Sequence, residues 1–173
     1  MTPATGNDGL VARGTVVPSI ELPRLGAPGE PVPLVRTGAP GPTLAVFFKE
    51  SCPTCRFALP FLERLHRQVA PRGGRVVAVS QNAPGQTEAF RDDLDLTMPI
   101  LIDAPDLEMS RWFDLVSVPT LYLFDESGAI RSGLMGFNKR DLETMAGDLA
   151  ASSGAPKPSL WNAGEQIPES RPG

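Results

Sequence analysis

The sequence predicts an α/β domain in which helices flank a central mixed β-sheet. Two observations predict this class. Short apolar runs alternate with helical patterns through the middle of the chain, and two further runs near its end are joined by a turn. Alternating strands and helices imply parallel pairing, whereas a short turn implies an antiparallel hairpin. The length of 173 residues fits one such domain.

The first central strand is predicted at Thr43–Phe48, a short apolar run. A helical pattern follows over Pro53–Val69. Pro53 suits the first helical turn, where a missing N–H costs nothing, and Pro60 predicts a kink. The apolar stripe of this helix repeats every four residues, at Phe57, Phe61, Leu65 and Val69.

The remaining central elements are short. Strands are predicted at Arg75–Ser80, Ile100–Ile102, Thr120–Phe124 and Ile130–Gly136. Helices are predicted at Gln86–Leu94, Asp106–Phe113 and Lys139–Ala151. The turn composition of Asp125–Gly128 joins the last two strands into a hairpin.

The chain divides into three parts by composition. Residues 1–15 are expected to form a flexible N-terminal arm, and residues 16–151 the folded domain. Extended pieces at Val16–Leu25 and Pro31–Val35 and a Gly- and Pro-rich loop at residues 38–42 precede the first central strand. Residues 152–173 are polar and Pro-rich, so we expect a tail that is disordered or draped over the surface.

Charge and hydropathy exclude several classes of protein. The net charge is −4 and no run of Lys or Arg forms a basic stripe, so nothing favours nucleic-acid binding. No segment approaches about 18 consecutive apolar residues, so we expect no membrane span. The N-terminus has no basic start followed by an apolar stretch, so we expect no signal peptide and a cytoplasmic location. We also expect a monomer.

The two cysteines, Cys52 and Cys55, are the strongest chemical signal. Cys52 lies between a predicted strand and a predicted helix, where unpaired N–H groups and the helix dipole favour a thiolate. Cys55 lies one turn further on, on the same side. We therefore expect Cys52 to be the nucleophile and Cys55 to attack the mixed disulfide that forms on it.

Other interpretations of the pair are weaker. A disulfide across so short a loop would stabilise the fold little. Free cysteines can be structural apolar residues, but that does not explain their placement between strand and helix. Zinc requires four ligands, and the chain offers no third cysteine and only His66, which falls on the polar side of its helix.

A second feature is Pro119, which directly precedes the apolar run Thr120–Phe124. Taken alone, it can simply begin a strand. Pro119 is one of three features that resemble the thioredoxin superfamily. The others are residues 43–60, which hold the strand, the Cys-Pro-Thr-Cys segment and its helix, and the predicted hairpin with Gly128 and Gly136. The resemblance covers residues 16–151.

That resemblance implies a thioredoxin-like fold and a cis bond before Pro119, which would face the two cysteines. It also implies that the backbone of Val118 pairs with the backbone of a substrate. Pro53 and Thr54 would complete the substrate-facing surface and tune the reduction potential. Known members span roughly −270 to −120 mV, and we expect a value towards the reducing end.

The strand–helix–strand passage over Arg75–Asp103 is longer than in plain thioredoxin, and an N-terminal extension precedes the domain. The chain therefore resembles the redoxin branch, which includes TlpA-like thiol–disulfide reductases and AhpC/TSA peroxiredoxins. The peroxiredoxin pattern is Pro-x-x-x-Thr/Ser-x-x-Cys. Here Ala45 and Lys49 replace its Pro and its hydroxyl residue, so a peroxidase ranks second.

The chain also departs from thioredoxin itself. Ser51 replaces the usual Trp, and Val46 replaces the buried acid that accepts the proton of the second cysteine. Glu50 could accept that proton and Lys49 could stabilise the Cys52 thiolate. Alternatively, both are solvated loop charges.

The sequence therefore predicts an enzyme that reduces or exchanges disulfides in proteins or small molecules, using an external thiol as electron donor. Its only redox group would be the Cys52–Cys55 dithiol, with no cofactor and no metal. Two alternatives remain open: a peroxidase of the peroxiredoxin type, and a binding module whose cysteines sense redox state without catalysis.

Overall fold

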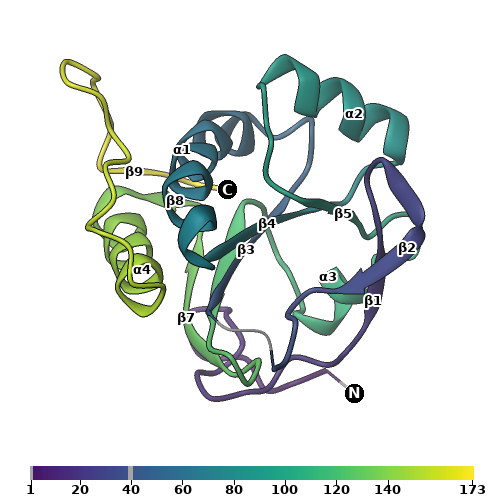
Figure 1. The fold of residues 1–173 in the computed structure, drawn as a ribbon. Helices are drawn as coiled ribbons and strands as arrows, with labels where there is room; N and C mark the ends of the chain where they lie inside the picture. Colours follow the sequence, from purple (N-terminus) through teal and green to yellow (C-terminus); the bar gives the residue numbers. More distant parts are fainter. Residues whose placement is uncertain (1, 39–40) are drawn as a thin grey trace.

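The structure of the protein is a computed structural model that describes residues 2–38 and 41–173. A seven-stranded sheet forms its centre, with the strand order β2-β1-β5-β4-β3-β6-β7 (Figure 1). Met1 of the expected arm and residues 39–40 of the expected loop lie outside the described residues.

The strand bounds match the predicted elements closely in the middle of the chain. The strands are β1 (Glu21–Arg24), β2 (Ala27–Pro33), β3 (Thr43–Phe48), β4 (Arg75–Ser80), β5 (Ile100–Ile102), β6 (Thr120–Phe124) and β7 (Ile130–Met135). Strands β3, β4 and β5 run parallel, while β6 pairs antiparallel with both β3 and β7. The predicted mixed sheet is therefore confirmed.

Helices cover both faces of this sheet. They are α1 (Pro53–Val69), α2 (Pro84–Asp93), α3 (Glu108–Trp112) and α4 (Lys139–Ser152), with a 3₁₀ turn η1 (Ala70–Arg72) after α1. Helix α1 continues through Pro60 without interruption. None of the helices in the described part of the chain is long and apolar enough to cross a membrane.

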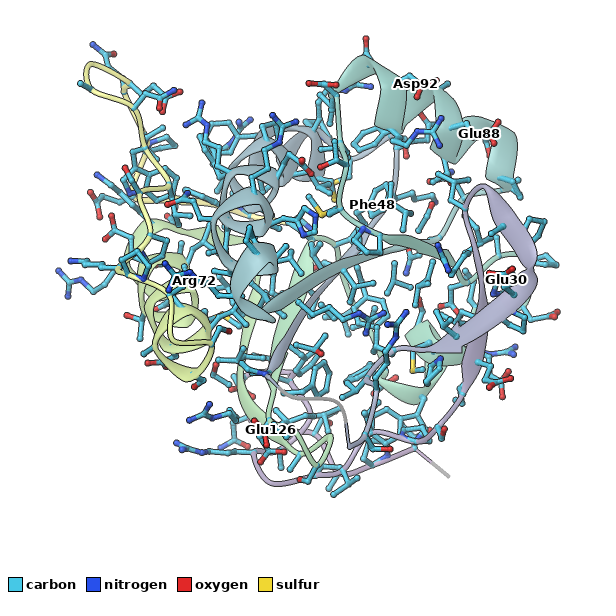
Figure 2. All side chains as sticks on the ribbon, in the orientation of Figure 1. Glu30, Phe48, Arg72, Glu88, Asp92 and Glu126 are labelled. Carbon is cyan, nitrogen blue, oxygen red and sulfur yellow. The ribbon has the colours of Figure 1, made fainter. Side chains whose placement is uncertain are left out.

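Strand β3 is buried along its whole length because both of its faces are covered. Phe48 points to the face covered by α1, α2 and α4, where it stacks on Phe90 of α2 with ring centroids 5.1 Å apart (Figure 2). Phe47 points to the opposite face, where its ring lies 5.1 Å from that of Phe113. Figure 2 also shows Glu88 and Asp92 on the outer side of α2.

The N-terminal segment has a defined place, unlike the flexible arm that we expected. Thr5 and Val11 form an antiparallel bridge, and the backbone N–H of Val11 donates to the hydroxyl of Tyr122 at 3.0 Å. Val11 is only 3% exposed. Tyr122 lies inside the core, so its hydroxyl needs a partner, and this segment supplies an N–H.

The tail beyond α4 also differs from a disordered segment. It runs away from α4 and returns to pair a short strand β9 (Ser170–Arg171) antiparallel with β8 (Phe137–Asn138), beside α1 (Figure 1). Leu160 within it is 3% exposed and packs into the same core as α1 and α4. The tail is therefore draped over the domain and held by buried contacts.

Glu63 is a buried charge on α1 that ties the helix to the turn before β5. Its carboxylate accepts hydrogen bonds from the backbone N–H of Thr97 at 2.9 Å and of Met98 at 3.0 Å, and forms an ion pair with Arg67 at 2.7 Å. Burial alone would raise the pKa of Glu63, but bonds from Thr97, Arg67 and the two backbone groups outweigh it and lower the pKa.

We expect Glu63→Gln to reduce the free energy of unfolding at pH 7 by about 1–3 kcal/mol, because it leaves buried donors without a carboxylate. A lowered folded-state pKa contributes stability above the ordinary value of 4.5, and that contribution is lost as the pH falls through the folded-state pKa. Urea denaturation should therefore show a smaller difference between wild type and variant at pH 3. An equal difference at both pH values would contradict this assignment.

Candidate active site

Cys52 begins helix α1 as its N-cap residue. Its Sγ accepts the backbone N–H of Cys55 at 3.1 Å, so the sulfur lies over the unpaired N–H groups of the first turn. The same thiol donates to the carbonyl oxygen of Val118 at 3.2 Å. Cys52 is half-buried, so a reagent can approach it from one side. This is the environment expected for an attacking thiolate.

Cys55 lies beneath Cys52 and is fully buried. No disulfide joins the two residues in this structure. Burial, followed by the hydrogen bond with Cys52, raises the pKa of the Cys55 thiol far above its usual range. Two cysteines three residues apart thus have different chemistry: one is accessible, and the other is buried and kept protonated.

The register of the sheet explains why Val118 meets Cys52. Strand β6 runs antiparallel to β3, and Thr120 at its start pairs with Phe47 near the end of β3. The residues just before β6 therefore lie beside those just after β3. The Val118–Pro119 peptide bond is cis, as the resemblance predicts, and Pro119 is buried.

The connection between β3 and α1 is held by its backbone. The N–H of Cys52 donates to the carbonyl of Lys49 at 3.1 Å, and the N–H of Glu50 donates to Asn82 Oδ1 at 2.8 Å. In the described part of the chain, neither the Lys49 nor the Glu50 side chain has a hydrogen bond or ion pair. Their proposed proton-handling roles therefore stay predictions.

Asn82 was not predicted from the sequence as a residue of the site. It is 8% exposed and follows β4, and its amide oxygen fixes the loop that presents Cys52. A buried Asn just beyond a buried strand is a weak signal, because its partner lies 32 residues away along the chain.

Between the cysteines, Pro53 is exposed and Thr54 is 7% exposed. The Thr54 hydroxyl donates to the carbonyl oxygen of Pro172 at 2.7 Å. The tail therefore reaches the Cys-Pro-Thr-Cys segment itself, a contact that the sequence did not predict.

The structure places no hydroxyl or carboxylate group at positions 45, 46 and 49, where the sequence departs from peroxiredoxin and thioredoxin. Ala45 and Val46 are fully buried inside β3, where neither offers a polar atom to the sulfurs. Lys49 is exposed. The side chains at the signature positions therefore provide neither a hydroxyl for a peroxide nor a buried carboxylate for the Cys55 proton.

His66 is not the solvated residue that we expected. It is half-buried, its Nδ1 has no hydrogen-bond partner among the described residues, and burial lowers its pKa. The turn of α1 that carries it packs against the core, so even its polar side is partly covered. Across residues 2–38 and 41–173, no group of three or more His, Cys, Asp or Glu residues is placed to hold a metal ion.

Comparison with known proteins agrees with this geometry. The model of the AhpC/TSA family matches residues 14–132, more than half of the chain. The chain belongs to the AhpC/TSA family. The protein is similar to the thioredoxin-like protein YneN of Bacillus subtilis, with 34% identity over 102 residues, which cover 56% of this chain and 58% of YneN.

A second relative is the thiol-disulfide oxidoreductase ResA of Halalkalibacterium halodurans, with 32% identity over 85 residues, or 49% of this chain and 48% of ResA. The chain thus spans about half the length of these two relatives. A crystal structure from Chlorobium tepidum, assigned to the thiol:disulfide interchange protein DsbE, superposes with a TM-score of 0.72 at 22% identity. It covers 83% of this chain and 99% of that one. This likeness establishes the thioredoxin-like fold of this AhpC/TSA protein.

The unequal burial of the two thiols predicts selective alkylation. Reduced wild-type protein treated with iodoacetamide at pH 7 should take up one carboxamidomethyl group, on Cys52, because the Cys55 thiol is buried and protonated. The Cys52→Ser variant should stay unmodified over the same time. Mass spectrometry of the intact protein measures both, and rapid modification of Cys55 in folded protein would refute the assignment.

Proposed function

We propose that the protein is a thiol–disulfide oxidoreductase that reduces or exchanges disulfides through Cys52 and Cys55. The single observation that carries the proposal is the placement of the Cys52 sulfur. It lies on the N-terminus of α1, partly open to solvent, with the buried Cys55 one turn below and the Val118 carbonyl beside it. Family membership and the names of the relatives support the same activity.

The reaction follows from the two environments. The Cys52 thiolate attacks one sulfur of a substrate disulfide, which breaks the disulfide, forms a mixed disulfide and releases the other substrate sulfur as a thiolate. Cys55 then loses its proton and attacks the Cys52 sulfur. The Cys52–Cys55 disulfide forms, the second substrate thiol leaves, and two electrons have passed to the substrate. Two thiol groups of an external donor then reduce the Cys52–Cys55 disulfide to the dithiol and are themselves oxidised to a disulfide.

The second step requires Cys55 to lose its proton. Because burial raises the pKa of Cys55, its thiolate is scarce at neutral pH, and formation of the mixed disulfide must precede its deprotonation. A mixed disulfide removes the hydrogen bond and the charge of Cys52, both of which raise the Cys55 pKa in the free enzyme. Attack by Cys52 therefore itself favours attack by Cys55.

The substrates in this proposal are protein or small-molecule disulfides, and the donor is an external thiol. The reacting group is the dithiol alone, with no cofactor or metal. Pro53, Thr54 and the backbone of Val118 border the Cys52 sulfur and would contact the substrate. A cytoplasmic, monomeric protein remains part of the proposal.

Membership of the AhpC/TSA family makes a thiol peroxidase the second candidate. In that reaction the Cys52 thiolate would attack a peroxide oxygen instead of a sulfur. The signature Pro and hydroxyl positions hold Ala45 and Lys49, and a cysteine one helical turn away suits dithiol exchange better. Peroxidase activity therefore ranks below disulfide reduction.

Insulin reduction with a dithiol donor tests the proposal. Wild type should accelerate the reaction, and Cys52→Ser should lose at least about a hundredfold in rate because the attacking sulfur is gone. Cys55→Ser should accumulate mixed disulfides on Cys52, which non-reducing electrophoresis and mass spectrometry detect.

The alternatives give different results in the same assay. Faster consumption of hydrogen peroxide than of insulin, dependent on Cys52, would favour the peroxidase. An absence of turnover with any donor, combined with redox-dependent partner binding, would leave the non-enzymatic module.

A further inference from the structure

The tail beyond α4 reaches the candidate active site. Its last described residues lie beside α1 and β8, close to the middle of the molecule (Figure 1). Pro172 accepts the Thr54 hydroxyl at 2.7 Å. Gly173 lies beside Val118, the residue whose carbonyl also accepts the Cys52 thiol. The surface that would receive a substrate backbone therefore holds a segment of this chain.

The upstream part of the tail is firmly anchored. Leu160 is buried in the core, and Trp161 lies edge-on to Phe61 of α1 with ring centroids 4.9 Å apart. Arg64 of α1 makes two hydrogen bonds of 2.7 Å to Glu165 and holds the pKa of that carboxyl at about 2. This part of the tail stays docked near neutral pH and keeps the following residues close to the site.

The tip of the tail, residues 170–173, is held more lightly. Ser170 and Arg171 form a two-residue ladder with β8, and the Arg171 guanidinium lies 4.5 Å from the centre of the Phe57 ring. Pro172 has no N–H, so the ladder cannot continue past it. Ser170, Pro172 and Gly173 are exposed to solvent.

Two glycines permit this close approach. A Cβ on Gly173 would lie 2.7 Å from the Val118 carbonyl oxygen, and one on Gly136 would lie 2.8 Å from the Arg171 carbonyl oxygen. Gly136 has a φ of +73°, which few other residues adopt. Any side chain at position 173 would have to push the tip away from Val118.

We propose that residues 170–173 are an internal ligand of the substrate surface and must leave it before a protein disulfide can dock. The inference rests on the proposed function. The tip resembles a bound substrate peptide in three respects. Its backbone is extended, one of its carbonyl groups accepts a hydrogen bond from Thr54, and it contacts Val118. The anchor at Leu160 and Trp161 keeps the tip at a high effective concentration, so even weak contacts compete with a substrate in solution.

A substrate then binds only the open form, so its apparent affinity falls by the open fraction. Small disulfides and small thiol reagents need less room, because Cys52 itself stays half-exposed while the tip contacts Thr54 and Val118. The tip therefore selects by size, and large substrates are slowed more than small ones.

The test uses the wild-type chain, a variant lacking residues 170–173, Gly173→Val and the control Ala163→Val. Ala163 is exposed in the same tail and lies outside the tip, so its substitution introduces the same valine side chain away from the site. Two reactions are measured, each with a large and a small reagent. Cys52 is alkylated by a polymer-linked maleimide or by N-ethylmaleimide, and the disulfide that is reduced belongs to insulin or to a small aromatic compound.

We expect the deletion and Gly173→Val to lower KM for insulin about tenfold, equivalent to about 1.4 kcal/mol, with kcat unchanged. The polymer-linked reagent should react correspondingly faster with both variants. N-ethylmaleimide and the small disulfide should change less than about twofold, and Ala163→Val should match wild type. Thermal melts check the fold, and Gly173→Val decides the question if the deletion destabilises the protein.

Equal KM values and equal alkylation rates in all four proteins would overturn the inference while leaving the proposed function intact. Failure of every protein to reduce any disulfide would overturn the proposed function, and the alkylation rates would then still show whether the tip covers Cys52. If the tip only protects the edge of the sheet, the deletion and Gly173→Val should change the melting temperature but not the ratio of the rates with large and small reagents. That result would also overturn the inference.

Discussion

The site depends on one interaction, the acceptance of the Cys55 N–H by the Cys52 sulfur at the start of α1. It makes the nucleophile part of the helix cap, so any force that places α1 also places the sulfur. That placement comes from the core: Leu59, Leu62 and Leu65 of α1 are fully buried against the sheet. Shifting the helix by one residue would move the sulfur off the unpaired N–H groups and away from Val118 together.

The same geometry separates the two thiols chemically. A helix turn directs Cys55 inward because the stripe that packs on the sheet begins one turn into the helix. Cys55 is therefore desolvated, while Cys52 at the helix end stays in contact with water. This difference between the two thiols arises from burial and does not require a buried carboxylate. It explains how a chain with Val46 at the position of the buried carboxylate could still order the two steps.

The sequence predicted the central elements well because their signals are local. An apolar run such as Thr43–Phe48 is buried on both faces, and its observed bounds agree with the prediction. Pro53 after Cys52 marked the start of α1. Those signals were sufficient to place both cysteines at the boundary between strand and helix.

The features that were missed are held by distant contacts. Val11 meets Tyr122 across 111 positions of sequence, and Thr54 meets Pro172 across 118. A Gly- and Pro-rich segment gives no periodic pattern by which such a docking site could be found. Leu160 and Trp161 are isolated apolar residues in a polar tail, and only their contacts with the core and with Phe61 show their role.

The Gly- and Pro-rich composition that made the docking of the tail unpredictable also suits residues 170–173 to reversible binding at the substrate surface. A tip with a longer ladder would pair with β8 more tightly, and a bulky residue at position 173 could not approach Val118 at all. Pro172 stops the ladder after Arg171, and Gly173 permits contact without adding apolar burial. The tip is thus close enough to compete with a substrate and too lightly held to exclude one. A Pro-Gly sequence that follows the anchored Trp161 in the same tail provides both properties.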